Sequence, residues 1–119
     1  MKISIFLNFN NTIILINPYF IISLMVQSYQ EVSGVILEEL VANSVNFKEV
    51  DYQKYFYNLK MKKPENYEGL VFDTNGDKPY SENLSSIFMD FLLCGFMDFN
   101  KKIIPKSLEG IMEYIKSVK

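Results

Sequence analysis

The sequence predicts an α+β fold, in which two β-hairpins or one mixed antiparallel sheet pack with about four helices in a single globular domain, residues 1–119. Residues 81–100 carry apolar side chains around most of a helix, a pattern typical of a buried, central helix. Within residues 2–16, one segment alternates polar and apolar side chains and another is continuously apolar, and both patterns are typical of strands. Asn75-Gly76 stands between two apolar segments and suits a tight hairpin turn. The alternative is a mainly helical domain with only the N-terminal hairpin.

The composition is that of a folded protein without a strong electrostatic field. Hydrophobic residues make up 49% and aromatic residues 15% of the chain, which excludes wholesale disorder. The net charge of -2 gives no global attraction to nucleic acid. All 12 positive side chains are Lys, and His, Trp and Arg are absent. The frequent Ile, Asn, Lys, Tyr and Phe have AT-rich codons, which indicates a low-GC genome.

Residues 2–7 and 12–16 are predicted to pair as a hairpin across a turn at residues 8–11. Asn17 and Pro18 then suit the cap and first position of a helix.

That helix is predicted to reach Asn43, because apolar side chains recur at three- or four-residue steps. Two alternatives stay open. Residues 19–26 are rich enough in β-branched side chains to form a third strand, and Gly34 could break the helix.

The N-terminal apolar segment is not expected to direct export or to enter a membrane. Its longest apolar run, residues 13–26, is interrupted by Asn17 and Pro18. The run is also shorter than the roughly 20 residues that a helix needs to span a bilayer.

Residues 45–50 are predicted as a short strand. Asp51 is the expected cap of the next helix, which Pro64 ends. The apolar face of that helix has regular helical spacing and consists of Tyr52, Tyr55, Phe56 and Leu59.

Residues 68–80 are predicted as the second hairpin, whose second strand Pro79 confines to a sheet edge. The central helix follows and ends at residues 100–102. A last helix opens at Pro105 or Ser107. Its expected buried face consists of Leu108, Ile111, Met112 and Ile115.

No motif for catalysis survives inspection, and we predict no catalytic residue, no metal and no cofactor. Cys94 has no His to activate it, and its apolar neighbours predict a buried, inert thiol. A calcium loop starting at Asp73 would need Gly at its sixth and Glu at its twelfth position, but Gly76 is fourth and Leu84 twelfth. The acids that could supply a carboxylate pair are best explained as caps and solvated side chains: Asp51, Asp73, Asp77, Asp90 and Asp98.

A basic segment offers an alternative function in nucleic-acid binding. Lysines beside aromatic rings are the chemistry that single strands require. The rings, however, are expected in the core, and acids follow downstream. The residues of this alternative site are Lys54, Lys60, Lys62 and Lys63.

An acidic segment is the most suggestive feature of the sequence. Between residues 65 and 82 the acids outnumber the single base, Lys78, and two tyrosines lie among them. Such a surface suits a basic protein, because opposite charge speeds encounter and aromatic side chains anchor the complex. The predicted partner-binding residues are Glu65, Tyr67, Glu68, Asp73, Asp77, Tyr80 and Glu82.

These observations favour a non-enzymatic protein-binding inhibitor, such as a toxin immunity protein, an antitoxin or a phage-encoded inhibitor. Its partner would be a basic toxin or nuclease. The alternatives are a small nucleic-acid-binding protein and a carboxylate- or metal-dependent enzyme. Unpaired hairpin edges would also permit a homodimer. A single cysteine is typical of a reducing compartment, so we expect a cytoplasmic protein.

Overall fold

The structure is a computed structural model, and it describes residues 5–9, 12–16 and 27–119. Strands β1 (Ile5–Phe9) and β2 (Thr12–Ile16) pair antiparallel as a hairpin, as predicted, but β1 includes Asn8 and Phe9, which the sequence predicts in the turn. Three predictions lie outside the described residues: the helix start at Asn17, the role of Pro18, and the choice between helix and strand for residues 19–26.

The rest of the described chain consists of helices joined by loops, so the predicted α+β fold is wrong. Beyond the β1–β2 pair, residues 27–119 contain only isolated backbone bridges and no further strand. The alternative of a mainly helical domain with one N-terminal hairpin describes the structure better. The helices are α2 (Tyr29–Ala42), α3 (Tyr52–Lys62), α4 (Glu82–Leu93) and α5 (Leu108–Ser117), with short 3-10 turns η1 (Pro64–Asn66) and η2 (Pro105–Ser107).

Helix α2 begins at its own cap rather than continuing from residue 18. The Ser28 hydroxyl accepts a hydrogen bond from the Glu31 amide at 3.1 Å, and the Glu31 carboxylate accepts from the Ser28 amide at 3.4 Å. This reciprocal capping box is visible in the sequence as Ser-x-x-Glu. Gly34 does not break the helix. A Cβ at this position would lie 2.5 Å from a methyl of Val118, so glycine allows the C-terminus to pack closely.

The segment after α2 corrects a second prediction. Residues 45–50 form a turn and no strand, because the Asn46 carbonyl accepts hydrogen bonds from the Glu49 and Val50 amides. Helix α3 then follows as predicted. The Asp51 carboxylate caps it by accepting from the Gln53 amide at 2.9 Å. The predicted apolar face of α3 packs on the core, with Phe56 fully buried.

The second hairpin was also predicted wrongly. Asp73 and Tyr80 exchange backbone hydrogen bonds of 2.7 and 3.0 Å, but the residues between them form no ladder. Asn75-Gly76 lies inside this wide loop and does not form a two-residue turn.

Helix α4 is shorter and more amphipathic than the predicted 81–100 helix. The Ser81 hydroxyl caps it, accepting from the Leu84 amide at 3.2 Å. Gly95, at φ 81°, reverses the chain just past its end, a conformation that glycine adopts without strain. Met89 and Leu93 are exposed, so the helix is not buried all round.

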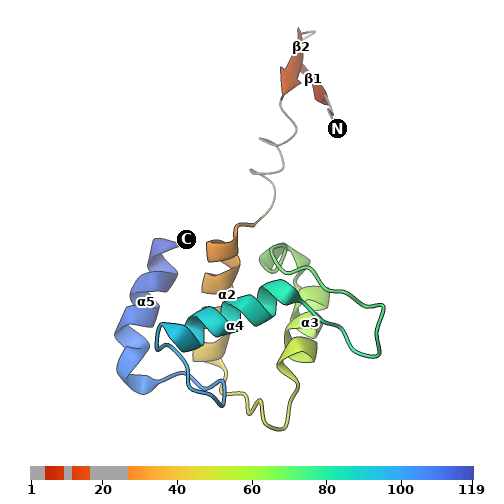
Figure 1. Ribbon diagram of the computed structural model, residues 1–119. Helices are drawn as coiled ribbons and strands as arrows, with labels where there is room; N and C mark the ends of the chain where they lie inside the picture. Colours follow the sequence, from red (N-terminus) through yellow and green to blue (C-terminus); the bar gives the residue numbers. More distant parts are fainter. Residues whose placement is uncertain (1–4, 10–11, 17–26) are drawn as a thin grey trace.

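Helices α2 and α4 share the centre of the helical body. Figure 1 shows α4 crossing α2, with α5 near one end of α4 and α3 near the other. Helix α5 follows η2 at the predicted place, but its inner face is narrower than predicted: Ile111 and Ile115 are buried, whereas Leu108 and Met112 are exposed. The largest buried side chains of the two central helices are Ile36, Leu37, Leu84, Ile87, Phe88 and Phe91.

No helix within the described residues combines the length and the apolar character that crossing a bilayer requires.

Candidate functional site

The five acids of the predicted partner surface all lie exposed to solvent. Between residues 27 and 119 the structure contains one ion pair, Lys119–Glu38 at 2.7 Å, which involves none of them. Some also support the fold locally: the Asp73 carboxylate accepts from the Asn75 amide at 2.8 Å. The five acids are Glu65, Glu68, Asp73, Asp77 and Glu82.

The two tyrosines of this surface have different environments. Tyr80 is 48% exposed beside Asp73. Tyr67 is only 3% exposed and packs edge-on against Phe56, with ring centroids 6.1 Å apart. Burial, assisted by the charge of Glu39, raises the pKa of Tyr67 above its ordinary value. Tyr67 therefore belongs to the core, whereas the five acids and Tyr80 are exposed.

The lysines of the alternative site are not equivalent either. Lys60 is partly buried, and its ammonium group donates a hydrogen bond to the Leu70 carbonyl. Lys60 and Lys62 lie in the last turn of α3, where positive charge complements the helix dipole. Lys54, Lys62 and Lys63 are exposed.

The aromatic rings beside those lysines are used within the fold. The Tyr55 hydroxyl donates to the Glu39 carboxylate at 2.7 Å, and burial together with this bond raises the pKa of Tyr55 to about 12. Tyr57 packs edge-on against Phe72 at a centroid distance of 5.4 Å. Rings held in this way offer no continuous stacking platform for bases, so the geometry does not favour the nucleic-acid alternative.

Asp90, one of the candidate acids, is bonded at the surface. The Tyr29 hydroxyl donates to the Asp90 carboxylate, and burial together with this bond raises the pKa of Tyr29.

The candidate acids and the cysteine form no metal site within the part of the chain that the structure describes. No three His, Cys, Asp or Glu side chains gather there where they could hold a metal ion. Cys94 is exposed at the end of α4, which corrects its predicted burial.

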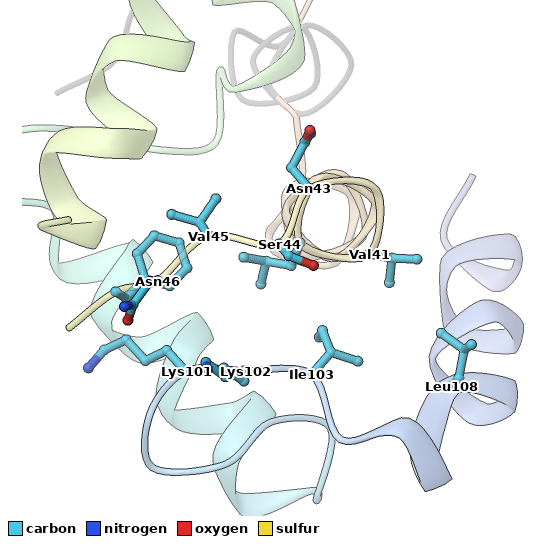
Figure 2. A pocket seen from close by; sticks show the side chains of 11 residues that line it. Val41, Asn43, Ser44, Val45, Asn46, Lys101, Lys102, Ile103 and Leu108 are labelled. Atoms are coloured by element: carbon cyan, nitrogen blue, oxygen red, sulfur yellow. The ribbon is translucent and has the colours of Figure 1, made fainter. Parts of the chain in front are cut away.

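A cavity of about 410 Å³ lies where the end of α2 meets the chain that leads into α5. Figure 2 shows Val45 and Asn46 on one side and Lys101, Lys102 and Ile103 along another, with the Lys101 ammonium pointing away from Ile103; Val41 and Leu108 lie toward the opposite end. We call it the lysine-rimmed cavity. Its lining consists of apolar Leu40, Val41, Val45, Phe47, Ile103 and Leu108 and polar Asn43, Ser44, Asn46, Lys101 and Lys102.

The loop that carries the two lysines is held in a defined shape. The Asp98 carboxylate accepts from the Asn100 amide at 2.8 Å and from the Lys102 amide at 3.1 Å. These bonds hold Lys101 at φ 61°, a left-handed conformation that non-glycine residues rarely adopt. The Lys101 ammonium lies 5.0 Å from the centroid of the Tyr52 ring. The sequence did not reveal this cavity, because its walls come from segments far apart in the chain.

The comparisons with known proteins add no relative. No protein-family model matches the chain, and no match was found among curated proteins or among solved structures.

Proposed function

We propose that the protein acts without catalysis, by binding and inhibiting a basic protein such as a toxin or a nuclease. The observation that carries the proposal is the run of exposed acids from Glu65 to Glu82, none of them in an ion pair with a described residue. An uncompensated acidic surface raises the association rate of a positively charged partner.

Exposed apolar side chains on the same segment support the proposal. Tyr80 is 48% and Val71 67% exposed, on the loop that Figure 1 shows reaching out beyond α3. Side chains of this kind provide the apolar contacts that charge alone lacks.

We extend the proposal to a cytoplasmic location. Cys94 is the chain's one cysteine, and it is exposed. An exposed, unpaired thiol is compatible with a reducing compartment and would cross-link copies of the chain in an oxidising one.

The test is affinity capture from the source organism, followed by titration of the captured protein with purified components. A basic partner binding at 1:1 stoichiometry is expected. The variant Glu65→Gln/Glu68→Gln/Asp77→Asn should weaken binding about tenfold, because each exposed charge pair contributes about 0.2–1 kcal/mol. The control Glu49→Gln/Glu109→Gln/Glu113→Gln removes the same charge elsewhere and should change the affinity less than twofold.

Capture of nucleic acid, or of the protein itself, with no other protein would contradict the proposal. Equal weakening by the two triple variants would show that net charge, and not the 65–82 surface, governs binding.

A further inference from the structure

We propose that the lysine-rimmed cavity binds a small carboxylate that carries an apolar body. Its volume of about 410 Å³ lies within the range of small-molecule pockets in proteins. The inference does not depend on the proposed function, because the cavity shares no residue with the 65–82 surface.

The apolar lining suits the body of such a ligand. Leu40 is 7% exposed and contributes to the core, so this part of the lining is anchored. Val41 and Leu108 are 37% and 43% exposed. An apolar group seated between them would remove their surface from water, which favours binding.

The polar lining suits the carboxylate. Lys101 and Lys102 line one side of the cavity, and no acid lines it. The Lys101 ammonium lies against the Tyr52 ring, whereas the Lys102 side chain is exposed. The Asn46 side-chain oxygen already accepts from the Lys48 amide at 3.1 Å, which leaves its amide nitrogen to donate. Ser44 adds a hydroxyl. Hydrogen-bond donors and ammonium groups together recognise an anion.

The backbone that carries the lysines is also preorganised. Asp98 bonds two backbone amides of their loop, and Lys101 keeps a left-handed backbone conformation. A loop held in this way loses little conformational entropy when a ligand binds.

One competing explanation makes a different prediction. The last turn of α2 contains no basic residue, and its carbonyls end beside the cavity. Lys101 and Lys102 could serve only to neutralise this negative helix end. In that case their removal would lower stability, and no carboxylate would bind.

The experiment titrates the full chain with 4-phenylbutyrate and follows backbone amides by NMR. Saturable 1:1 binding is expected, with shifts concentrated in residues 40–47 and 101–108. The neutral analogue 4-phenylbutanol should bind at least about threefold more weakly, because it lacks the charge that the lysines attract. Acetate should also bind more weakly, because it lacks the apolar body. Added salt should weaken the binding of 4-phenylbutyrate alone.

The variant Lys101→Gln/Lys102→Gln should weaken 4-phenylbutyrate binding about tenfold and leave 4-phenylbutanol binding unchanged. The control Lys106→Gln/Lys116→Gln removes two exposed charges outside the cavity and should change neither affinity. Val41→Trp, at a partly exposed position, should block the cavity and abolish binding of both compounds.

Four results would overturn the proposal: no saturable binding at millimolar concentration, equal affinity for the acid and the alcohol, shifts centred elsewhere, or unchanged affinity in the Lys101/Lys102 variant. Urea unfolding of each variant checks that it is folded, and a loss of stability without bound carboxylate would support the helix-end explanation.

Discussion

The two loops that flank α4 have similar backbone features but differ in how much of each loop is buried and hydrogen-bonded. Each contains one isolated backbone bridge and one aspartate that caps a turn. The acidic loop, residues 67–81, holds Asp73 against Tyr80, and the side chains between them are almost all exposed. The lysine loop, residues 94–104, holds Met97 against Ile103, and Met97 is 2% exposed.

Backbone hydrogen bonds reinforce the difference. In the lysine loop the Phe96 amide donates to the Phe91 carbonyl and the Ile104 amide to the Phe96 carbonyl, both at 2.9 Å. The lysine loop is therefore preformed, whereas the acidic loop is anchored at its ends, where Leu70 and Ser81 are buried, and only its exposed tip, residues 74–78, can adapt. The lysine loop therefore suits a cavity wall, and the acidic loop suits the surface of a protein complex.

The largest expected effect is on stability, and it compares a buried side chain in the lysine loop with an exposed one in the acidic loop. Met97→Ala should lower the free energy of unfolding by about 3 kcal/mol, because it empties a core position. Val71→Ala, in the acidic loop at 67% exposure, should change it by less than about 0.5 kcal/mol. Urea denaturation measures both values, and similar losses in the two variants would remove the distinction.

The next effect tests the anchor at the C-terminal end of the acidic loop. The Gln53 side chain accepts from the Ser81 amide at 2.8 Å and donates to the Ser81 carbonyl at 3.0 Å, in a buried environment. Gln53→Leu should cost about 1–3 kcal/mol, because the buried Ser81 amide loses its acceptor, while the Ser81 carbonyl keeps its bond from the Ser85 amide. The exposed control Gln30→Leu should be near neutral in the same urea measurement. An equally small loss for Gln53→Leu would mean that the anchor is dispensable.

A smaller effect compares the two capping aspartates. Asp98→Ala should cost about 1–2 kcal/mol, since two amides lose an acceptor and Lys101 loses support for its left-handed backbone. Asp73→Ala, with one amide bonded, should cost about 0.5–1 kcal/mol. Adding Lys101→Gly to Asp98→Ala should restore up to about 1 kcal/mol, because glycine accepts positive φ. Thermal unfolding of the three variants tests this order; no rescue by glycine would contradict the role assigned to Asp98.

The smallest effect at neutral pH concerns Tyr67, which begins the acidic loop from within the core. Tyr67→Phe should change stability at pH 7 by less than about 0.5 kcal/mol, because the ring remains. It should also leave partner binding unchanged, since Tyr67 is buried.

The same variant should differ from the natural chain in alkali. Burial raises the pKa of Tyr67 above its ordinary value of 10.0, so the folded state keeps a proton that the unfolded chain loses. The contribution of this proton to the free energy of unfolding is fully present below pH 10 and declines as the pH rises further. Urea unfolding at pH 7 and at about one unit above pH 10 gives the free energy of unfolding at each pH. Between the two, this free energy should fall less for Tyr67→Phe than for the natural chain. Equal decreases in the two proteins would show that Tyr67 is exposed to solvent.

Local signals in the sequence were sufficient for helix α3 and for the helix ends that rest on one capping side chain. Asp51 caps α3 as predicted. Helix α2 ends at Asn43 as predicted, although the Asn43 side chain bonds the Glu39 carboxylate and no backbone group. Caps depend on side chains within a few residues of the backbone that they bond, so a sequence read locally can find them. Ser28 and Glu31 carried the same kind of signal, although the prediction overlooked it.

Strand predictions failed because β-branched residues and a turn dipeptide do not supply a partner strand. Residues 45–50 and 70–80 form strands only if another strand meets them, and residues 27–119 supply none. The acids from Glu65 to Glu82 could be recognised as a charged segment from the sequence. Only the tertiary structure decided that Tyr67 is buried and Tyr80 exposed, because burial depends on what packs against each ring. It also created the lysine-rimmed cavity, which joins residues 40–47 to residues 101–108 through contacts that no local pattern encodes.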